Sequence, residues 1–427
     1  DGHPHLAVEP GRDYVYDFQV TNRAGTYWYH PHPHMRTGAQ VNQGLAGLLL
    51  VSDEEEDALA LPSGTGELLC VLQDRRFDAR NQIEYLAGAM GGGRGGMAMG
   101  GMAAMMQSMN GWLGDQVLVN GRVSPTLDVD RRTYRLRILN GSNARIYKLA
   151  WGDSTPITVI GADGGLLEQA VTLRALTLAP AQRADILIDL SERPAGSTLE
   201  LRSLEYPVAA VGQVGMAGST SPLPQGAALR LMTLKVSRTV GPRVQLPTRL
   251  STFGADWAEH VGAPVRQIPL MYRQMNFTLA GRLFDMEAAE ADETVAPGST
   301  HIWEFVNQNN PMGMMMAHPI HLHGRQFRVL SRRGAETNAL GEGIHDAGLT
   351  DTVLVRPNET VRVQVTFSTF PGLYLYHCHI LEHEDMGMMS DIWVDWARPV
   401  NGFITAPETP GHGLKIKPEI MTKHAVQ

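Results

Sequence analysis

Short runs of alternating apolar and polar residues recur along almost the whole chain, with turns between them. In the first part, three runs have this pattern: Tyr14–Phe18, Gly25–His30 and Leu45–Val51. Similar runs continue through residues 67–202 and again through residues 249–394. A period of two residues is typical of β-strands with one buried face. The pattern therefore predicts an all-β protein.

Two breaks in this pattern divide the chain into three parts. The acidic stretch from Ser52 to Asp57 is expected to be a solvated linker. The proline-spaced stretch from Val240 to Thr248 is expected to be a second linker. We therefore expect three domains, which cover residues 1–53, 54–238 and 239–427, the last ending in an extended or wrapping tail.

The middle domain contains a low-complexity insert, residues 87–110, made largely of Gly, Ala and Met. Such a composition offers little to pack, so we expect a mobile loop or hairpin. The insert also holds many of the 21 methionines of the chain, a feature that bears on function below.

A sequence repeat relates the first and third domains. Gly25–His32 (GTYWYHPH) matches Gly372–His379 (GLYLYHCH), with Pro31 in the position of Cys378. The middle domain has a comparable strand, Gly196–Ser203, without histidine. We interpret the chain as three related β-sandwich units, of which the middle one binds no metal.

Composition narrows the classes of function. The 427 residues suffice for several domains, and 43% of them are hydrophobic, enough for full cores. The net charge of −8 argues against a nucleic-acid partner. Since no run of eighteen apolar residues occurs, no membrane span is expected. Of the two cysteines, Cys70 lies in an apolar run and is expected to be a buried, inert thiol.

The stretch Tyr376–Met388 (YHCHILEHEDMGM) carries the densest set of metal ligands. On a strand, neighbouring side chains point to opposite faces, so His377 and His379 share one face and Cys378 takes the other. A thiolate, two imidazoles and a weak thioether form a blue-copper site. Cys378, His383 and Met388 would supply three of these ligands, while Met386 and Met389 compete with Met388.

A second cluster, His318–Gly324 (HPIHLHG), follows the same rule. His318 would join Cys378 and His383, and a second centre would gather histidines from the first and third domains. A zinc site is the alternative, although zinc would not require the thioether or the flanking pairs. The expected ligands of the second centre are His30, His32, His321, His323, His377 and His379.

These motifs resemble those of three-domain bacterial multicopper oxidases, the laccase and cuprous oxidase group. The resemblance covers nearly all of the chain to about Val394 and implies cupredoxin-like β-sandwich domains with up to four coppers. By this likeness, His318, Cys378, His383 and Met388 match the type 1 copper ligands. The matching type 2 and type 3 ligands of the trinuclear cluster are His321 for type 2 and His30, His32, His323, His377 and His379 for type 3.

The chain departs from this family in its first domain. The trinuclear cluster of the family uses eight histidines, and six match here. The missing pair belongs to a motif upstream of the Asp-Gly with which this chain starts. We therefore expect an incomplete first domain, either in a fragment or in a protein whose separate N-terminal piece supplies the two histidines.

The resemblance implies that a donor reduces the type 1 copper and that the cluster reduces dioxygen to water. Glu384 and Asp1 match acidic residues that the family uses for protons, although both could be ordinary carboxylates. Phenolic or aromatic donors are our first expectation, with a periplasmic or secreted location.

Cuprous oxidation is the second expectation, because Met314 and Met316 crowd the segment before His318 and thioethers bind Cu(I). These methionines could instead fill gaps in the core. A copper-binding or electron-transfer module without oxidase activity is the third.

Overall fold

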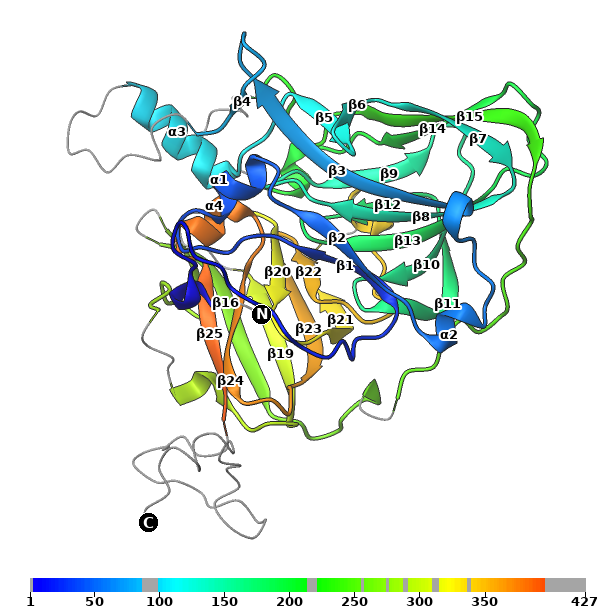
Figure 1. Ribbon diagram of the computed structural model, residues 1–427. Helices are drawn as coiled ribbons and strands as arrows, with labels where there is room; N and C mark the ends of the chain where they lie inside the picture. Colours follow the sequence, from blue (N-terminus) through cyan, green and yellow to red (C-terminus); the bar gives the residue numbers. More distant parts are fainter. Residues whose placement is uncertain are drawn as a thin grey trace.

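The computed structural model describes residues 3–86, 99–212, 221–254, 257–273, 276–286, 291–308, 315–335 and 339–395. Asp1, Met314, the first part of the insert and the tail lie outside these ranges. The described chain consists mainly of strands in layered sheets (Figure 1), which confirms the all-β prediction.

The middle of the chain forms a sandwich of an eight-stranded and a five-stranded sheet. The larger sheet has the order β11-β10-β13-β8-β3-β5-β6, with β4 paired to β3, and the smaller has the order β12-β9-β14-β15-β7. The first contains β3 (Glu67–Phe77), β4 (Ile83–Glu84), β5 (Gln116–Val119), β6 (Arg122–Val123), β8 (Thr133–Asn140), β10 (Ile157–Ala162), β11 (Gly165–Leu173) and β13 (Arg183–Asp189); the second contains β7 (Thr126–Arg131), β9 (Tyr147–Trp151), β12 (Leu176–Leu178), β14 (Thr198–Ser203) and β15 (Leu229–Val240).

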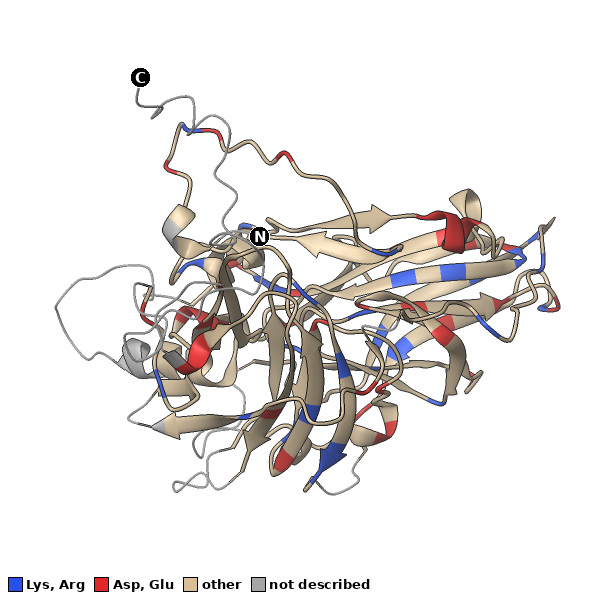
Figure 2. Cartoon of the chain, turned by 90° about the horizontal axis from the view of Figure 1, so that it is seen from below, with Lys and Arg blue, Asp and Glu red and all other residues tan. Residues whose placement is uncertain are grey.

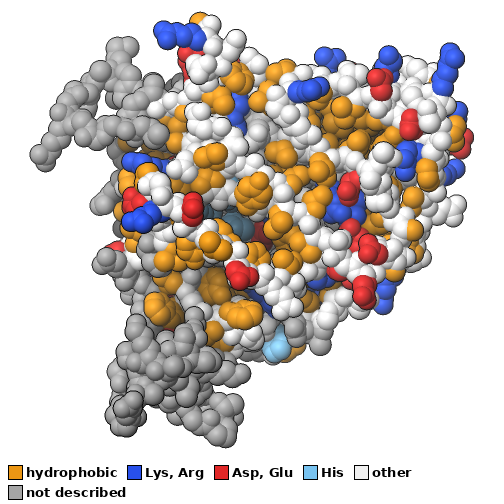
Figure 3. All heavy atoms as spheres, viewed as in Figure 1, with side chains coloured by type: hydrophobic (Ala, Val, Ile, Leu, Met, Phe, Trp, Pro, Cys, Tyr) orange, Lys and Arg blue, Asp and Glu red, His pale blue; other side chains and the backbone are white. Residues whose placement is uncertain are grey.

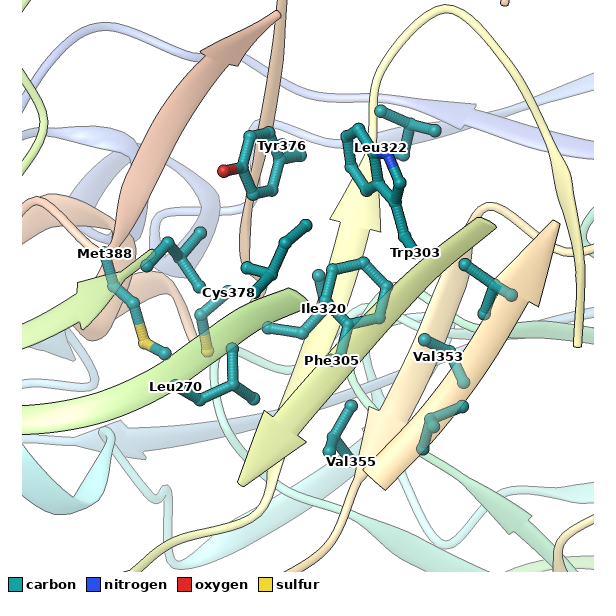
Figure 4. Close-up of a cluster of buried hydrophobic side chains, with 14 of the residues drawn as sticks. Leu270, Trp303, Phe305, Ile320, Leu322, Val353, Val355, Tyr376, Cys378 and Met388 are labelled. Atoms are coloured by element: carbon teal, nitrogen blue, oxygen red, sulfur yellow. The ribbon is translucent and has the colours of Figure 1, made fainter. Parts of the chain in front are cut away.

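A second sandwich follows, built from two five-stranded sheets with the orders β17-β16-β19-β23-β21 and β18-β25-β24-β20-β22. Its core holds Trp303, Phe305, Ile320 and Tyr376, and Cys378 belongs to the same core (Figure 4). The strands are β16 (Val265–Arg273), β17 (Asn276–Leu279), β18 (Thr294–Val295), β19 (Thr300–Asn307), β20 (His318–Leu322), β21 (Phe327–Arg333), β22 (Thr352–Val355), β23 (Glu359–Thr366), β24 (Gly372–Cys378) and β25 (Met389–Val394).

The first part of the chain contributes a two-stranded antiparallel sheet, β1 (Gly25–Tyr29) with β2 (Gly47–Val51). The expected strand at Tyr14–Phe18 was wrong: this run is exposed, has no regular secondary structure, and pairs with no strand among the described residues. Figure 3 shows many hydrophobic side chains on the face that this segment and β1–β2 present. Exposed apolar residues in this region include Val15, Tyr16, Phe18, Tyr29, Leu49 and Leu50.

Strand β8 explains how the first and middle parts are joined. Every one of its residues is buried, although a strand with one solvated face would alternate. Tyr134, Leu136 and Ile138 enter the sandwich core, while Arg135 and Arg137 point the other way. These two arginines meet carboxylates of α2 and β13, so the outer face of the sheet is covered by the first part of the chain.

The acidic stretch after β2 is not a plain solvated linker. It forms α2 (Glu54–Asp57), whose N-cap Asp53 accepts a hydrogen bond from the Glu56 amide at 2.8 Å. Glu56 is buried and lies 2.9 Å from both Arg135 and Arg137. The sequence pattern could not reveal the burial of Glu56, because acidic residues in a buried ion pair and acidic residues in an exposed run look the same in the sequence.

The second half of the insert is a helix, α3 (Met99–Asn110), rather than a loop or hairpin. Met, Ala and Gln favour helices, and Gly111 follows in the left-handed conformation at φ +80° that commonly ends them. Residues 87–98 lie outside the described ranges. The remaining α-helices of the described chain are α1 (Thr37–Asn42) and α4 (Leu381–Asp385).

Charged residues of both signs are interspersed over the strands and loops (Figure 2), and neither sign gathers into one large area there. Within the described residues, no helix combines the length and apolar character that crossing a membrane requires.

We predict that Glu56→Ala lowers the free energy of unfolding by about 3–5 kcal/mol, because it leaves Arg135 and Arg137 buried with one carboxylate fewer. Urea unfolding followed by circular dichroism measures this change. Glu54→Ala, at an exposed position of the same helix, is the matched control. Equal midpoints for the two variants would contradict the role given to Glu56.

Candidate metal centre

Strand β24 lies between β20 and β25 and presents different ligands on its two faces. Cys378 pairs with Ile320 and faces the sandwich core, whereas His377 pairs with His321 and faces outward. His318 lies two residues before Ile320 and therefore shares the face of Cys378. The register alone divides the candidate ligands into two groups.

The first group surrounds the thiol of Cys378. Its Sγ lies 3.4 Å from Nδ1 of His318 and 3.6 Å from Nδ1 of His383, and all three residues are buried. Met388 is fully buried, and Figure 4 shows its sulfur near that of Cys378. The backbone fixes the loop, because Cys378 N donates to Met388 O and Met388 N donates to His383 O. One thiol, two imidazoles and one thioether are thus buried together in the last sandwich.

The ring of His383 is held from both sides. Its Nε2 lies 3.1 Å from the carbonyl oxygen of Met109 on α3, so Nε2 carries the hydrogen and Nδ1 is left with a lone pair for a metal. Phe277 packs on the ring with centroids 4.1 Å apart. Burial lowers the pKa of His383 to about 4, which keeps the imidazole neutral.

The second group is a cluster of six imidazoles between the first part of the chain and the last sandwich. His32 Nε2 and His323 Nε2 lie 3.3 Å and 3.0 Å from Nε2 of His377. The ring centroids of His30 and His379 are 5.3 Å apart, and those of His321 and His379 are 5.7 Å apart. The structure therefore brings together the six histidines expected from the sequence: His30, His32, His321, His323, His377 and His379.

Helix α4 joins both groups to the other parts of the chain through its carboxylates. Glu382 accepts hydrogen bonds from Tyr85 OH at 2.8 Å, from Asn143 at 2.8 Å and from the Trp112 amide at 3.0 Å. Asp385 accepts from the backbone amides of Thr37 and Gly38 at the start of α1, at 2.9 and 3.0 Å. The helix that carries His383 is thereby fixed to both neighbouring regions.

Glu384, on the same helix, reaches the imidazole cluster. Its oxygens lie 3.4 Å from Nε2 of His32 and 3.1 Å from Nδ1 of His377. Burial raises the pKa of Glu384, but the imidazoles of His32 and His377 outweigh this effect and hold it below the ordinary value. The side chain is a carboxylate in contact with two potential ligands.

The donor set fits copper. Both ring nitrogens of His379 and Nδ1 of His32 are buried and have no hydrogen-bond partner among the described residues. Burial also lowers the pKa of His30 to about 4, so its imidazole is neutral at neutral pH. Burial raises the pKa of Cys378, a cost that a thiolate-binding metal removes by displacing the proton.

The remaining residues expected from the sequence, Met316, Met314 and Asp1, are not placed in either ligand group. Met316 is buried in the core of the last sandwich, and it lines a cavity of about 50 Å³ together with α3. Asp1 and Met314 lie outside the described residues. The sequence analysis did not predict the roles of the Met109 carbonyl, Glu382 and Asp385. A backbone acceptor has no sequence signature. The carboxylates on either side of His383 could have indicated that α4 is held in place by hydrogen bonds.

Comparison with known proteins gives the family. Family models described as "Multicopper oxidase" match residues 1–56, 94–197 and 263–397. The multicopper oxidase mco of Staphylococcus haemolyticus is 30% identical over 394 residues, which cover 92% of this chain and 73% of that protein. A laccase of Bacillus stratosphericus is 31% identical, covering 88% of this chain and 72% of the laccase.

Among solved structures, the McoA multicopper oxidase of Aquifex aeolicus superposes with a TM-score of 0.76 at 35% identity, covering 92% of this chain and 81% of that one. The family-model matches include the segment that carries β1 and β2 and strands of both sandwiches. The chain therefore belongs to the multicopper oxidases, copper-dependent oxidoreductases that use dioxygen as electron acceptor.

Proposed function

We propose that the chain is a laccase-like oxidase that takes single electrons from phenolic or aromatic donors. His318, Cys378, His383 and Met388 would hold the type 1 copper, and the six-histidine cluster would hold the coppers that meet dioxygen. The proposal rests on the peptide bond between His377 and Cys378 in β24. The side chain of Cys378 belongs to one donor set and the side chain of His377 belongs to the other, on opposite faces of the strand.

Copper bound at these residues would supply one-electron transfer in the first group and four-electron reduction of dioxygen in the second. The protein contributes the route between them, because the side chains of Cys378 and His377 are joined through one peptide unit. Cys378, His383 and Met388 are completely buried, so water is excluded from the thiolate. The neighbouring core makes the position rigid.

Glu384 is the residue that we assign to proton handling. Its carboxylate oxygens lie 3.4 Å from Nε2 of His32 and 3.1 Å from Nδ1 of His377, and neither oxygen accepts a well-aligned hydrogen bond from the described residues. A carboxylate in this place accepts a proton at Oε1 or Oε2 and passes it toward the cluster. Asp1, the second expected acid, lies outside the described residues.

Cuprous oxidation is the second candidate, and one observation favours it. Helix α3 covers His383, whose imidazole is fully buried and hydrogen-bonded to Met109, so an aromatic donor has no direct access to the ring edge. Methionines of this helix, Met106 and Met109, lie against the same core. Thioethers select Cu(I) among first-row metals. Buried Met316 contributes to that packing rather than to an open ion site.

The donor is identified by oxygen uptake of the copper-loaded protein together with the segment that we propose below to complete the cluster. We predict faster uptake with a small phenol than with Cu(I), measured with an oxygen electrode under the same conditions. Oxygen uptake that depends on Cu(I) and is negligible with phenols would contradict the laccase-like function and support cuprous oxidation. An intense visible band without uptake from either donor would identify an electron carrier.

We predict that Cys378→Ser abolishes both the visible thiolate-to-copper band and oxygen uptake, because a hydroxyl is not a thiolate donor. Cys70→Ser is the matched control: Cys70 is also buried, and burial raises its pKa to about 12, so it stays a protonated thiol remote from both groups. Absorption spectra and copper content measure the effect. A band that survives in Cys378→Ser, or disappears in Cys70→Ser, would contradict the assignment.

We also propose that a segment outside this sequence packs on β1 and β2 and supplies the two remaining histidines of the cluster. The exposed Val15, Tyr16, Phe18 and Leu49 support this, because large exposed apolar side chains mark an interface. Intact mass spectrometry of an oxygen-consuming sample is expected to detect a second polypeptide segment. An active sample that contains only residues 1–427 would contradict it.

A further inference from the structure

The ring of His321 is oriented by residues 350–352, a short loop that ends in the first residue of β22, rather than by its own strand. Its Nδ1 lies 2.9 Å from the carbonyl oxygen of Asp351 and 3.1 Å from Oγ1 of Thr352. A carboxylate oxygen of Asp351 is 3.4 Å away. Because a carbonyl and a carboxylate only accept hydrogen bonds, Nδ1 carries the ring hydrogen. Nε2 is therefore left with its lone pair on the side of the other histidines.

This loop is held by an arginine of the middle sandwich. Arg183, the first residue of β13, donates from its two terminal nitrogens to Oδ1 and Oδ2 of Asp351 at 2.7 and 2.6 Å. Its Nε donates to the carbonyl of Thr26 on β1 at 2.9 Å. Arg183 is 3% exposed, so these bonds form away from water. One side chain thus links all three parts of the chain at the loop beside His321.

Asp163 supports the same loop from behind. It accepts hydrogen bonds from the hydroxyl of Thr350 and from the amides of Asp351 and Thr352, the last two at 3.3 and 3.2 Å. It also accepts from the Arg183 amide at 2.7 Å. Loop residues 350–352 are therefore fixed by one guanidinium and one carboxylate, both from the middle sandwich.

We infer that Arg183 is a positioning residue for the cluster: by clamping Asp351, it holds the loop that keeps the hydrogen of His321 on Nδ1 and the Nε2 lone pair directed at the metal site. The described residues of the middle sandwich include no member of either ligand group. Through Arg183, this sandwich nevertheless controls the ligand geometry of the cluster. The inference rests on the proposed role of His321 as a ligand.

A lysine cannot replace this arginine fully. The planar guanidinium binds both oxygens of Asp351 and still reaches Thr26, whereas an ammonium is a single point charge on a flexible stem. Arg183→Lys retains the buried positive charge between Asp163 and Asp351, so it limits the cost of an uncompensated charge. The variant removes geometry while keeping charge.

The test uses the full chain carrying ¹⁵N-labelled histidine, with His321 assigned through a His321→Gln variant. In the copper-free wild type, ¹H–¹⁵N correlation spectra are expected to show His321 as the Nδ1–H tautomer; Arg183→Lys is expected to show a mixture. In the copper-loaded chain, Arg183→Lys should weaken retention of the cluster copper against a chelator by roughly 10–100-fold and leave the visible thiolate band unchanged.

Arg145→Lys is the matched control. Arg145 is equally buried and pairs with Asp74 at 2.8 Å, but its side-chain hydrogen-bond partners among the described residues all lie in the middle part of the chain. It should keep the wild-type tautomer of His321 and the wild-type copper retention. An Arg183→Lys protein with the wild-type tautomer, or one that loses band and cluster copper in parallel with the control, would overturn the inference.

A second variant decides the matter if Arg183→Lys does not fold. Asp351→Asn keeps the main-chain carbonyl beside His321 but weakens the clamp, so it should give the same mixture of tautomers; the wild-type tautomer would overturn the inference. If the wild type does not bind copper, the proposed function is contradicted instead. The comparison of His321 tautomers in the copper-free chain would then still test the positioning role of Arg183.

Discussion

The two-residue alternation of side chains along β24 is the constraint on which the rest of the structure depends. Cys378 faces the core of the last sandwich, and His377 faces outward, so the two ligand groups lie back to back. A slip of one residue in the register would exchange these faces. Pairing with both β20 and β25, together with the bond from Cys378 N to Met388 O, prevents such a slip.

The outward face requires partners from elsewhere in the chain, and buried charges provide the connections. Arg135 and Arg137 tie β8 to α2, Arg183 ties β13 to the loop beside His321, and the carboxylates of α4 reach both neighbouring regions. Such pairs add little net stability over apolar contacts, but they penalise any other arrangement. The imidazole cluster thus assembles only when the parts of the chain are docked correctly.

The sequence predicted the strand-rich fold and the division of the histidines between two groups, because spacing along a strand determines the face. It missed what depends on long-range partners. The run at Tyr14–Phe18 alternates like a strand but has no described neighbour to pair with. Glu56 and Arg183 look like ordinary surface charges until the fold buries them. The α3 helix was hidden by its glycine-rich surroundings, and the Met109 carbonyl that it offers to His383 has no sequence signature.

Copper K-edge anomalous diffraction from crystals of the copper-loaded chain shows whether the two faces of β24 bind separate coppers. We expect one peak within bonding distance of Cys378 Sγ, His318 Nδ1 and His383 Nδ1, and further density on the opposite face of β24 among the six imidazoles. A peak at the sulfur that is also bound by His377 or His379, or copper absent from one of the two faces, would contradict this expectation.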